Sequence, residues 1–185
     1  MKKNLALVLA VIAVTVMILF TVDFQSVDEY YLTHLEDITS DSETVTLSVT
    51  CGTVLDNYDS LKESLKYSGT VPADGVILSE TEYVLRDGDT VFDILNRALQ
   101  YNKIHFDYSG SPNSPSETVY IKGINNIYEY DCGDLSGWMY CVNGEFPQYS
   151  CSEYRLSDGD TVEWMYTCDL GRDVGDVYYG GNQSE

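Results

Sequence analysis

Residues 131–173 read DCGDLSGWMYCVNGEFPQYSCSEYRLSDGDTVEWMYTCDLGRD and contain both tryptophans of the chain and four of its five cysteines. Apolar and aromatic side chains recur at every second position in two parts of this stretch, 138–142 and 162–168. A period of two is typical of β-strands. Asn143-Gly144 follows the first run and favours a tight hairpin turn, because both residue types tolerate positive φ. The stretch therefore predicts two aromatic strands of a small β-rich domain with cysteines at their flanks.

The residues before this stretch complete an α+β pattern. Residues 44–51 alternate as a half-buried strand, and residues 76–85 contain two strand-like pieces. Residues 91–98 have helical spacing, and Thr90 with Asp93 resembles a capping box at the start of that helix. Several short strand candidates follow between residues 104 and 131. The order predicts one main helix laid on a mixed sheet.

The pentapeptide DGDTV occurs twice, at residues 87–91 and 158–162. Each copy follows a strand-like segment, which indicates that the same turn ends two strands. The aspartates could bind a cation, but neither copy has the further spaced acids of an EF-hand loop. Turn and helix-cap chemistry is therefore the preferred interpretation.

The N-terminal segment is expected to be a membrane anchor. Leu5–Val22 is an apolar run of eighteen residues preceded by Lys2 and Lys3, and as a helix it would be about 27 Å long, enough to span a bilayer core. The lysines favour a cytoplasmic N-terminus. Residues 1–22 are predicted to be a signal-anchor helix, with a cleaved signal as the alternative. The expected location is the cell membrane, single-pass with an extracellular C-terminal domain, or secretion if the segment is cleaved.

Composition limits the partners of the remaining chain. The first 22 residues hold two lysines and no acid, so the rest carries eight basic and thirty acidic residues, a net charge of −22. Such a charge repels nucleic acid and anionic lipid, so we expect no nucleic-acid partner and membrane contact through the N-terminal helix only. The expected organisation is an acidic stalk over residues 23–43, one domain over residues 44–177 and a flexible tail over residues 178–185.

Five cysteines in an exported chain predict disulfides with one thiol left over. Cys51 and Cys168 end two strands on their apolar faces, so parallel neighbouring strands would bring both sulfurs to one end of the sheet. This predicts a Cys51–Cys168 bond. Cys132 and Cys151 flank the Trp138 hairpin and are predicted to pair across its base, which leaves Cys141 as the spare thiol. Metal binding is not expected, because the chain has no C-x-x-C motif.

Catalysis is not expected. The chain has no G-x-S-x-G motif. It has only two histidines, so few Ser-His-Asp triads are possible. The candidate ligand-binding residues are the aromatic side chains of the hairpin region and one arginine: Trp138, Tyr140, Phe146, Tyr149 and Arg172. The rings could form a platform for a flat ligand or a sugar. The alternatives are core positions for Trp138 and Trp164 and a local salt bridge for Arg172.

Four motifs together resemble a known family: SGWMY at 136–140, VNG at 142–144, DGDTV at 158–162 and TCDLGRD at 167–173. They are similar to the transcobalamin-like C-terminal domain of bacterial surface proteins, a family of largely unassigned function. The similarity runs from about Val45 to Gly175. It implies a β-grasp-like mixed sheet with one main helix, here disulfide-stapled and placed after the N-terminal membrane segment.

The resemblance also implies a ligand class. In the vitamin-carrying relatives this domain closes over one face of cobalamin, and a separate helical domain supplies the other face. The first functional hypothesis is therefore a non-catalytic module for a corrinoid-like small molecule, with cobalamin as ligand and no other cofactor. The alternative is an adhesion module for a surface protein or glycan. A small-molecule site needs a concave aromatic pocket, whereas adhesion needs only a flat exposed patch.

Overall fold

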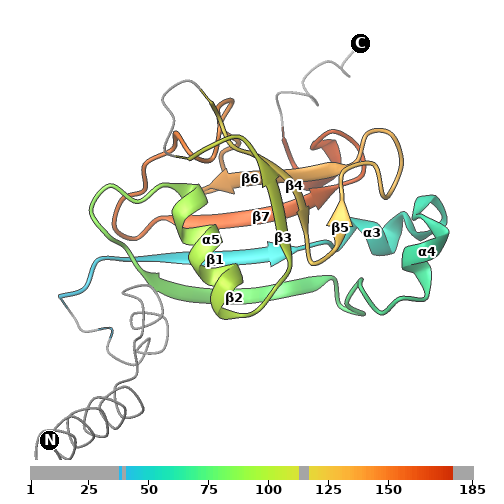
Figure 1. The fold of residues 1–185 in the computed structure, drawn as a ribbon, viewed down its shortest axis with the longest axis horizontal. Coiled ribbons are helices and arrows are strands. Elements are labelled where there is room, and N and C mark those ends of the chain that lie inside the picture. The colour runs from blue at the N-terminus through green and yellow to red at the C-terminus, as the bar shows by residue number, and fades with distance from the viewer. Residues whose placement is uncertain (1–37, 39–40, 113–116, 177–185) are drawn as a thin grey trace, which may run out of the picture.

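The computed structural model describes residues 38, 41–112 and 117–176, which contain two β-sheets and one long helix (Figure 1). The four-stranded sheet has the order β2 (Val76–Val84), β1 (Thr44–Thr50), β7 (Thr161–Thr167), β6 (Gly137–Val142). β1 is antiparallel to β2 and parallel to β7, and β7 is antiparallel to β6. The predicted parallel pairing of the first and last strands is thus confirmed, and it lies in the centre of the sheet.

The second sheet has three strands and was not expected. It contains β3 (Phe106–Ser109), β4 (Tyr120–Ile124) and β5 (Ile127–Tyr128), all antiparallel. Figure 1 shows this sheet and helix α5 (Val91–Tyr101) on the same side of the four-stranded sheet. The Phe92 ring packs edge-on against Tyr108 of β3 at 4.9 Å between centroids. The α+β prediction of one main helix on a mixed sheet is therefore confirmed, with a small second sheet added to the same layer.

The core lies between the four-stranded sheet and this covering layer. Along β1 and β7 the buried residues alternate with partly exposed ones, as the period of two predicted. The inward side chains of α5 complete this core. Its fully enclosed side chains include Leu47, Val49, Ile94, Leu95, Leu99, Ile124, Ile127, Val162 and Tyr166.

The segment after β1 forms three short helices. They are α3 (Thr53–Asp56), η2 (Tyr58–Ser60) and α4 (Glu63–Lys66). Asn57 and Leu61 leave the helical backbone conformation between them, with ψ values of 27° and 137°. Near the C-terminal end of the described chain, η3 (Arg172–Val174) follows β7.

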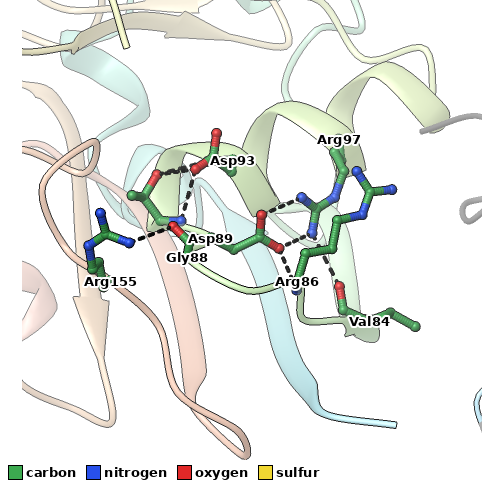
Figure 2. Close-up of polar contacts among 8 residues, drawn as sticks. Val84, Arg86, Gly88, Asp89, Asp93, Arg97 and Arg155 are labelled. Atoms are coloured by element: carbon green, nitrogen blue, oxygen red, sulfur yellow. Dashed lines mark hydrogen bonds and ion pairs between the residues drawn. The ribbon is translucent and has the colours of Figure 1, made fainter. Parts of the chain in front are cut away.

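The first DGDTV copy forms a buried ion pair (Figure 2). Both Asp89 carboxylate oxygens accept from Arg97 of α5, at 2.8 and 2.5 Å, and one also accepts the Arg86 backbone N–H at 2.8 Å. Asp89 and Arg97 are 8% and 9% exposed. Thr90 and Asp93 form the predicted capping box. The Asp89 carboxylate is therefore occupied by the ion pair and a turn contact, and the Asp93 carboxylate by the helix cap. The turn and cap contacts are those that the sequence analysis preferred.

The predicted anchor over residues 1–22, the tail over 178–185 and nearly all of the stalk over 23–43 lie outside the described residues. Among the described residues, none of the helices has the length and apolar character needed to span a bilayer. The location of the chain and its domain boundaries stay predictions.

Asp89→Asn should destabilise the fold. The substitution leaves the buried Arg97 guanidinium without its counter-charge, which costs about 3–5 kcal/mol in comparable buried pairs. Denaturant unfolding followed by far-UV circular dichroism measures the loss. Asp87→Asn is the matched control, because Asp87 is exposed in the same turn. Equal stability of the two variants would contradict the role given to the ion pair.

Candidate ligand-binding site

Two adjoining hollows lie where β6, the edge strand of the four-stranded sheet, meets β4. The larger hollow has a volume of about 300 Å³, and its lining includes Tyr120, Tyr130, Asp134, Leu135, Trp138 and Leu170. The smaller hollow has a volume of about 150 Å³, and its lining includes Tyr120, Trp138, Tyr140, Tyr149, Ser150 and Trp164. Tyr120 and Trp138 line both. The concave aromatic surface required for a small-molecule site is therefore present.

Trp138 separates the hollows as a core residue. It is 8% exposed, and its indole N–H donates to the backbone oxygen of Ile127 at 2.8 Å. Its ring packs edge-on against Tyr166 at 5.2 Å between centroids. Trp138 thus offers a buried wall and has no free donor for a ligand.

Trp164 differs from Trp138 in the hydrogen bonding of its indole nitrogen. It is 2% exposed and lines the smaller hollow, and its indole nitrogen has no hydrogen-bond partner among the residues that the structure describes. A buried N–H group left without an acceptor costs about 1–3 kcal/mol. Buried polar groups of this kind are rare, so an acceptor supplied from outside the chain is the physical explanation to test.

Tyr140 and Tyr149 have different environments. Tyr140 is 8% exposed, its ring lies 5.4 Å from that of Trp164, and its hydroxyl donates to the backbone oxygen of Tyr149 at 2.8 Å. Burial raises the pKa of Tyr140, so this hydroxyl stays protonated at neutral pH. Tyr149 is 52% exposed and stacks on Tyr154 with ring centroids 5.7 Å apart. Tyr149 is therefore the accessible ring of this pair.

Phe146 and Arg172 lie apart from the two hollows. Phe146 lines a third hollow of about 210 Å³ with Pro147 and Tyr149, below the hairpin turn. Arg172 pairs with Asp169 three residues earlier, with its Nε donating at 2.9 Å. This ion pair lowers the pKa of Asp169 and is the local salt bridge named as the alternative for Arg172. The structure thus brings Trp138, Tyr140 and Tyr149 together at the smaller hollow. Phe146 shares only the third hollow with Tyr149, and Arg172 lines none of the three.

The sequence analysis missed the rim of the larger hollow. Tyr130 and Leu170 are 57% and 41% exposed, and both have positive φ, 64° and 50°. Such a backbone is a genuine outlier for bulky residues and costs about 1–3 kcal/mol each. Their N–H groups donate to the backbone oxygens of Ser136 and Leu135, both at 3.0 Å. The fold therefore holds two exposed apolar side chains at this rim in spite of backbone strain.

Acidic groups accompany this rim. Glu129 and Asp134 both line the larger hollow, and Glu129 accepts the Tyr120 hydroxyl at 2.6 Å. Burial and the Glu129 carboxylate raise the pKa of Tyr120, so the phenol remains a neutral donor. The rim thus favours neutral or cationic ligands over anions. Within the described part of the chain, no group of three or more His, Cys, Asp or Glu side chains is placed to hold a metal ion.

All five cysteines are thiols in this structure, and it shows neither predicted disulfide. The β1–β7 register, extended by one residue from Thr50↔Met165, places Cys51 level with Tyr166. Cys168 lies two residues further on and contacts Thr53. Cys132 contacts Asn57, whereas Cys151 lies at the start of α5, where its backbone oxygen accepts from Phe92. Cys141 donates to Glu163 at 3.3 Å.

Leu170→Gly should stabilise the chain while weakening any contact made through the rim. Glycine adopts positive φ without strain, so we expect a gain of about 1 kcal/mol in the free energy of unfolding. Leu135→Gly is the control, because Leu135 is equally exposed in the same hollow but is not among the positive-φ residues. Thermal unfolding compares the two. If Leu170→Gly lost as much stability as Leu135→Gly, the result would contradict the backbone strain assigned to Leu170.

The family comparison matches residues 88–168 to a profile described as "Domain of unknown function (DUF4430)". No curated protein matches the chain. The matched region includes α5, the second sheet, β6 and β7, and most of the lining of both hollows.

Two solved structures resemble the chain. One is haptocorrin in complex with Cbi, at 14% identity and a TM-score of 0.44, covering 72% of this chain and 27% of haptocorrin. The other is a Ruminococcus gnavus protein proposed to bind metal, at 16% identity and a TM-score of 0.39, covering 68% of this chain and 96% of that protein. The chain thus spans about a quarter of the length of haptocorrin. At these TM-scores neither likeness argues for a fold or a ligand. The match over residues 88–168 bears out the resemblance to the transcobalamin-like family seen in the sequence.

Proposed function

We propose that the chain is a non-catalytic binding module whose ligand lies across the two hollows on either side of Trp138. The observation that carries this proposal is the indole N–H of Trp164, which has no acceptor among the described residues and belongs to a residue that lines the smaller hollow. A carbonyl or amide oxygen of a ligand entering this hollow would accept that hydrogen bond. The hydrogen bond would be formed away from water, so it would contribute to both affinity and orientation.

The body of such a ligand would lie over the larger hollow. Tyr120, Tyr130 and Leu170 offer an exposed apolar surface there, and the backbone hydrogen bonds of the last two hold it in place before binding. A site organised in advance loses less conformational entropy when a ligand binds. The carboxylates of Glu129 and Asp134 disfavour anions. A flat, neutral or cationic molecule with projecting amide groups fits this description.

A corrinoid has these properties and is the ligand class that the family resemblance implies. The larger hollow, at about 300 Å³ and partly open to solvent, would cover only one face of such a molecule. A second body would then complete the site, as the helical domain does in the vitamin-carrying relatives. Contact with a surface protein or glycan through the exposed rings remains the alternative proposal.

Titration calorimetry of the full-length chain with cobalamin, cobinamide and a neutral oligosaccharide tests the ligand class. We expect micromolar binding of a corrinoid and none of the sugar. Trp164→Phe keeps an aromatic ring but removes the donor, so it should weaken binding about tenfold. Trp138→Ala is unsuitable as a test, because it removes a core residue.

Tyr67→Ala is the matched control, since Tyr67 is 85% exposed and lies outside the lining of both hollows. It should bind as the unchanged chain does. Unchanged corrinoid affinity in a folded Trp164→Phe chain would contradict the site. Binding of the sugar alone would favour the surface-contact alternative.

We also propose that residues 1–22 anchor this module to the membrane with the domain outside. The apolar run of eighteen residues behind two lysines supports this orientation. Protease added to intact cells should remove the domain and leave a membrane-bound N-terminal fragment. Protection of the domain until the cells are broken would contradict the orientation.

A further inference from the structure

Two cysteines from the loops that border the larger hollow meet each other. The Cys132 and Cys168 thiols are hydrogen-bond partners of each other. They also face the same short segment, because Cys132 contacts the backbone oxygen of Asn57 at 3.4 Å and Cys168 contacts the Thr53 hydroxyl at 3.7 Å. Asn57 and Thr53 are themselves bonded through the Asn57 amide. Four contacts thus place the two sulfurs at one point of the fold.

The two cysteines belong to the loops that border the hollow. Cys132 precedes Asp134, Leu135 and Ser136, and Cys168 lies between Thr167 and Leu170, all five of which line the larger hollow. The loops already touch, since the Leu170 N–H donates to the Leu135 oxygen at 3.0 Å. We propose that Cys132 and Cys168 form a disulfide bond that joins these two loops and fixes the border of the hollow. This bond goes beyond the proposed ligand binding and does not depend on it.

The bond would form by exchange with a low-molecular-weight disulfide or the disulfide of an oxidoreductase. The Cys168 thiolate, on the more exposed of the two residues, attacks one donor sulfur and forms a mixed disulfide while one donor thiolate leaves. The Cys132 thiolate then attacks the Cys168 sulfur, and the second donor thiolate leaves. The two cysteines lose two electrons and two protons, and the donor disulfide gains them as two thiols.

Burial makes this exchange slow in the folded chain. It raises the pKa of Cys168 to about 12 and also raises that of Cys132, so both groups are almost entirely protonated at neutral pH. The thiolate is the reacting form, and its fraction rises about tenfold per pH unit below that pKa. The bond should therefore form readily in an oxidising compartment during folding, or in the folded chain at alkaline pH.

Peptide mapping tests the pairing without any ligand. The full-length chain is refolded with glutathione disulfide, its remaining thiols are alkylated, and it is digested with chymotrypsin without reduction. Aromatic residues lie between every pair of neighbouring cysteines, so the digest separates all five. We expect a Cys132 peptide linked to a Cys168 peptide, which disappears on reduction. A Cys51–Cys168 or Cys132–Cys151 link, or alkylation of both Cys132 and Cys168, would overturn the proposal.

Melting temperature provides an independent readout. The oxidised chain should melt about 10 °C higher than the reduced chain, because the bond closes a loop of thirty-seven residues. Cys132→Ser should abolish this difference, and Cys141→Ser should retain it, since Cys141 lies on β6 beside Glu163. A Cys132→Ser chain that keeps the full difference would overturn the proposal. Loss of ligand binding with the bond intact would count against the proposed function alone.

Discussion

The parallel pairing of β1 with β7 holds the rest of the structure in place. It joins the first and last strands of the described chain, from Thr46↔Thr161 to Thr50↔Met165, and both strands bury one face completely. Parallel neighbours need a long connection between them. Here that connection supplies β2, α5, the three-stranded sheet and β6 (Figure 1). At one end of the pair the second DGDTV turn contacts Thr44, and at the other end Thr53 donates to the Tyr166 backbone oxygen.

The candidate site lies at the edge of the four-stranded sheet. β6 is the last strand of the sheet, and β5 lies over its aromatic face, where Trp138 and Tyr166 donate to the backbone oxygens of Ile127 and Tyr128. The loops after β5 and β7 then border a hollow that no strand closes. Tyr130 and Leu170 carry backbone strain at this border. Trp164, whose buried donor has no acceptor among the described residues, lines the adjoining smaller hollow. Features that reduce stability and lie in one region are typical of binding sites.

Local patterns explain what the sequence could predict. The alternation in β1 and β7, the Asn143-Gly144 turn and the Thr90–Asp93 capping box depend on neighbouring residues, so they are visible in the sequence and are present in the structure. The three-stranded sheet has strands of two to five residues, too short for a clear period. Trp138 was a binding candidate because a core face and an exposed platform have the same period of two. The positive φ of Leu170 is maintained by a bond to Leu135, and the meeting of Cys132 with Cys168 depends on the turn from β1 into α3, so neither could be seen locally.

The central claim is that Trp164 keeps its indole N–H available for a ligand while Trp138 does not. The chain has two tryptophans, so a ¹H–¹⁵N spectrum contains two indole signals, which the spectrum of a Trp164→Phe chain assigns. In the ligand-free chain we predict a downfield signal with a small temperature dependence for Trp138, which is bonded to Ile127, and an upfield signal for Trp164. Ligand should move the Trp164 signal downfield and leave that of Trp138 nearly unchanged. A Trp164 signal already typical of a hydrogen-bonded indole in the ligand-free chain would contradict the account.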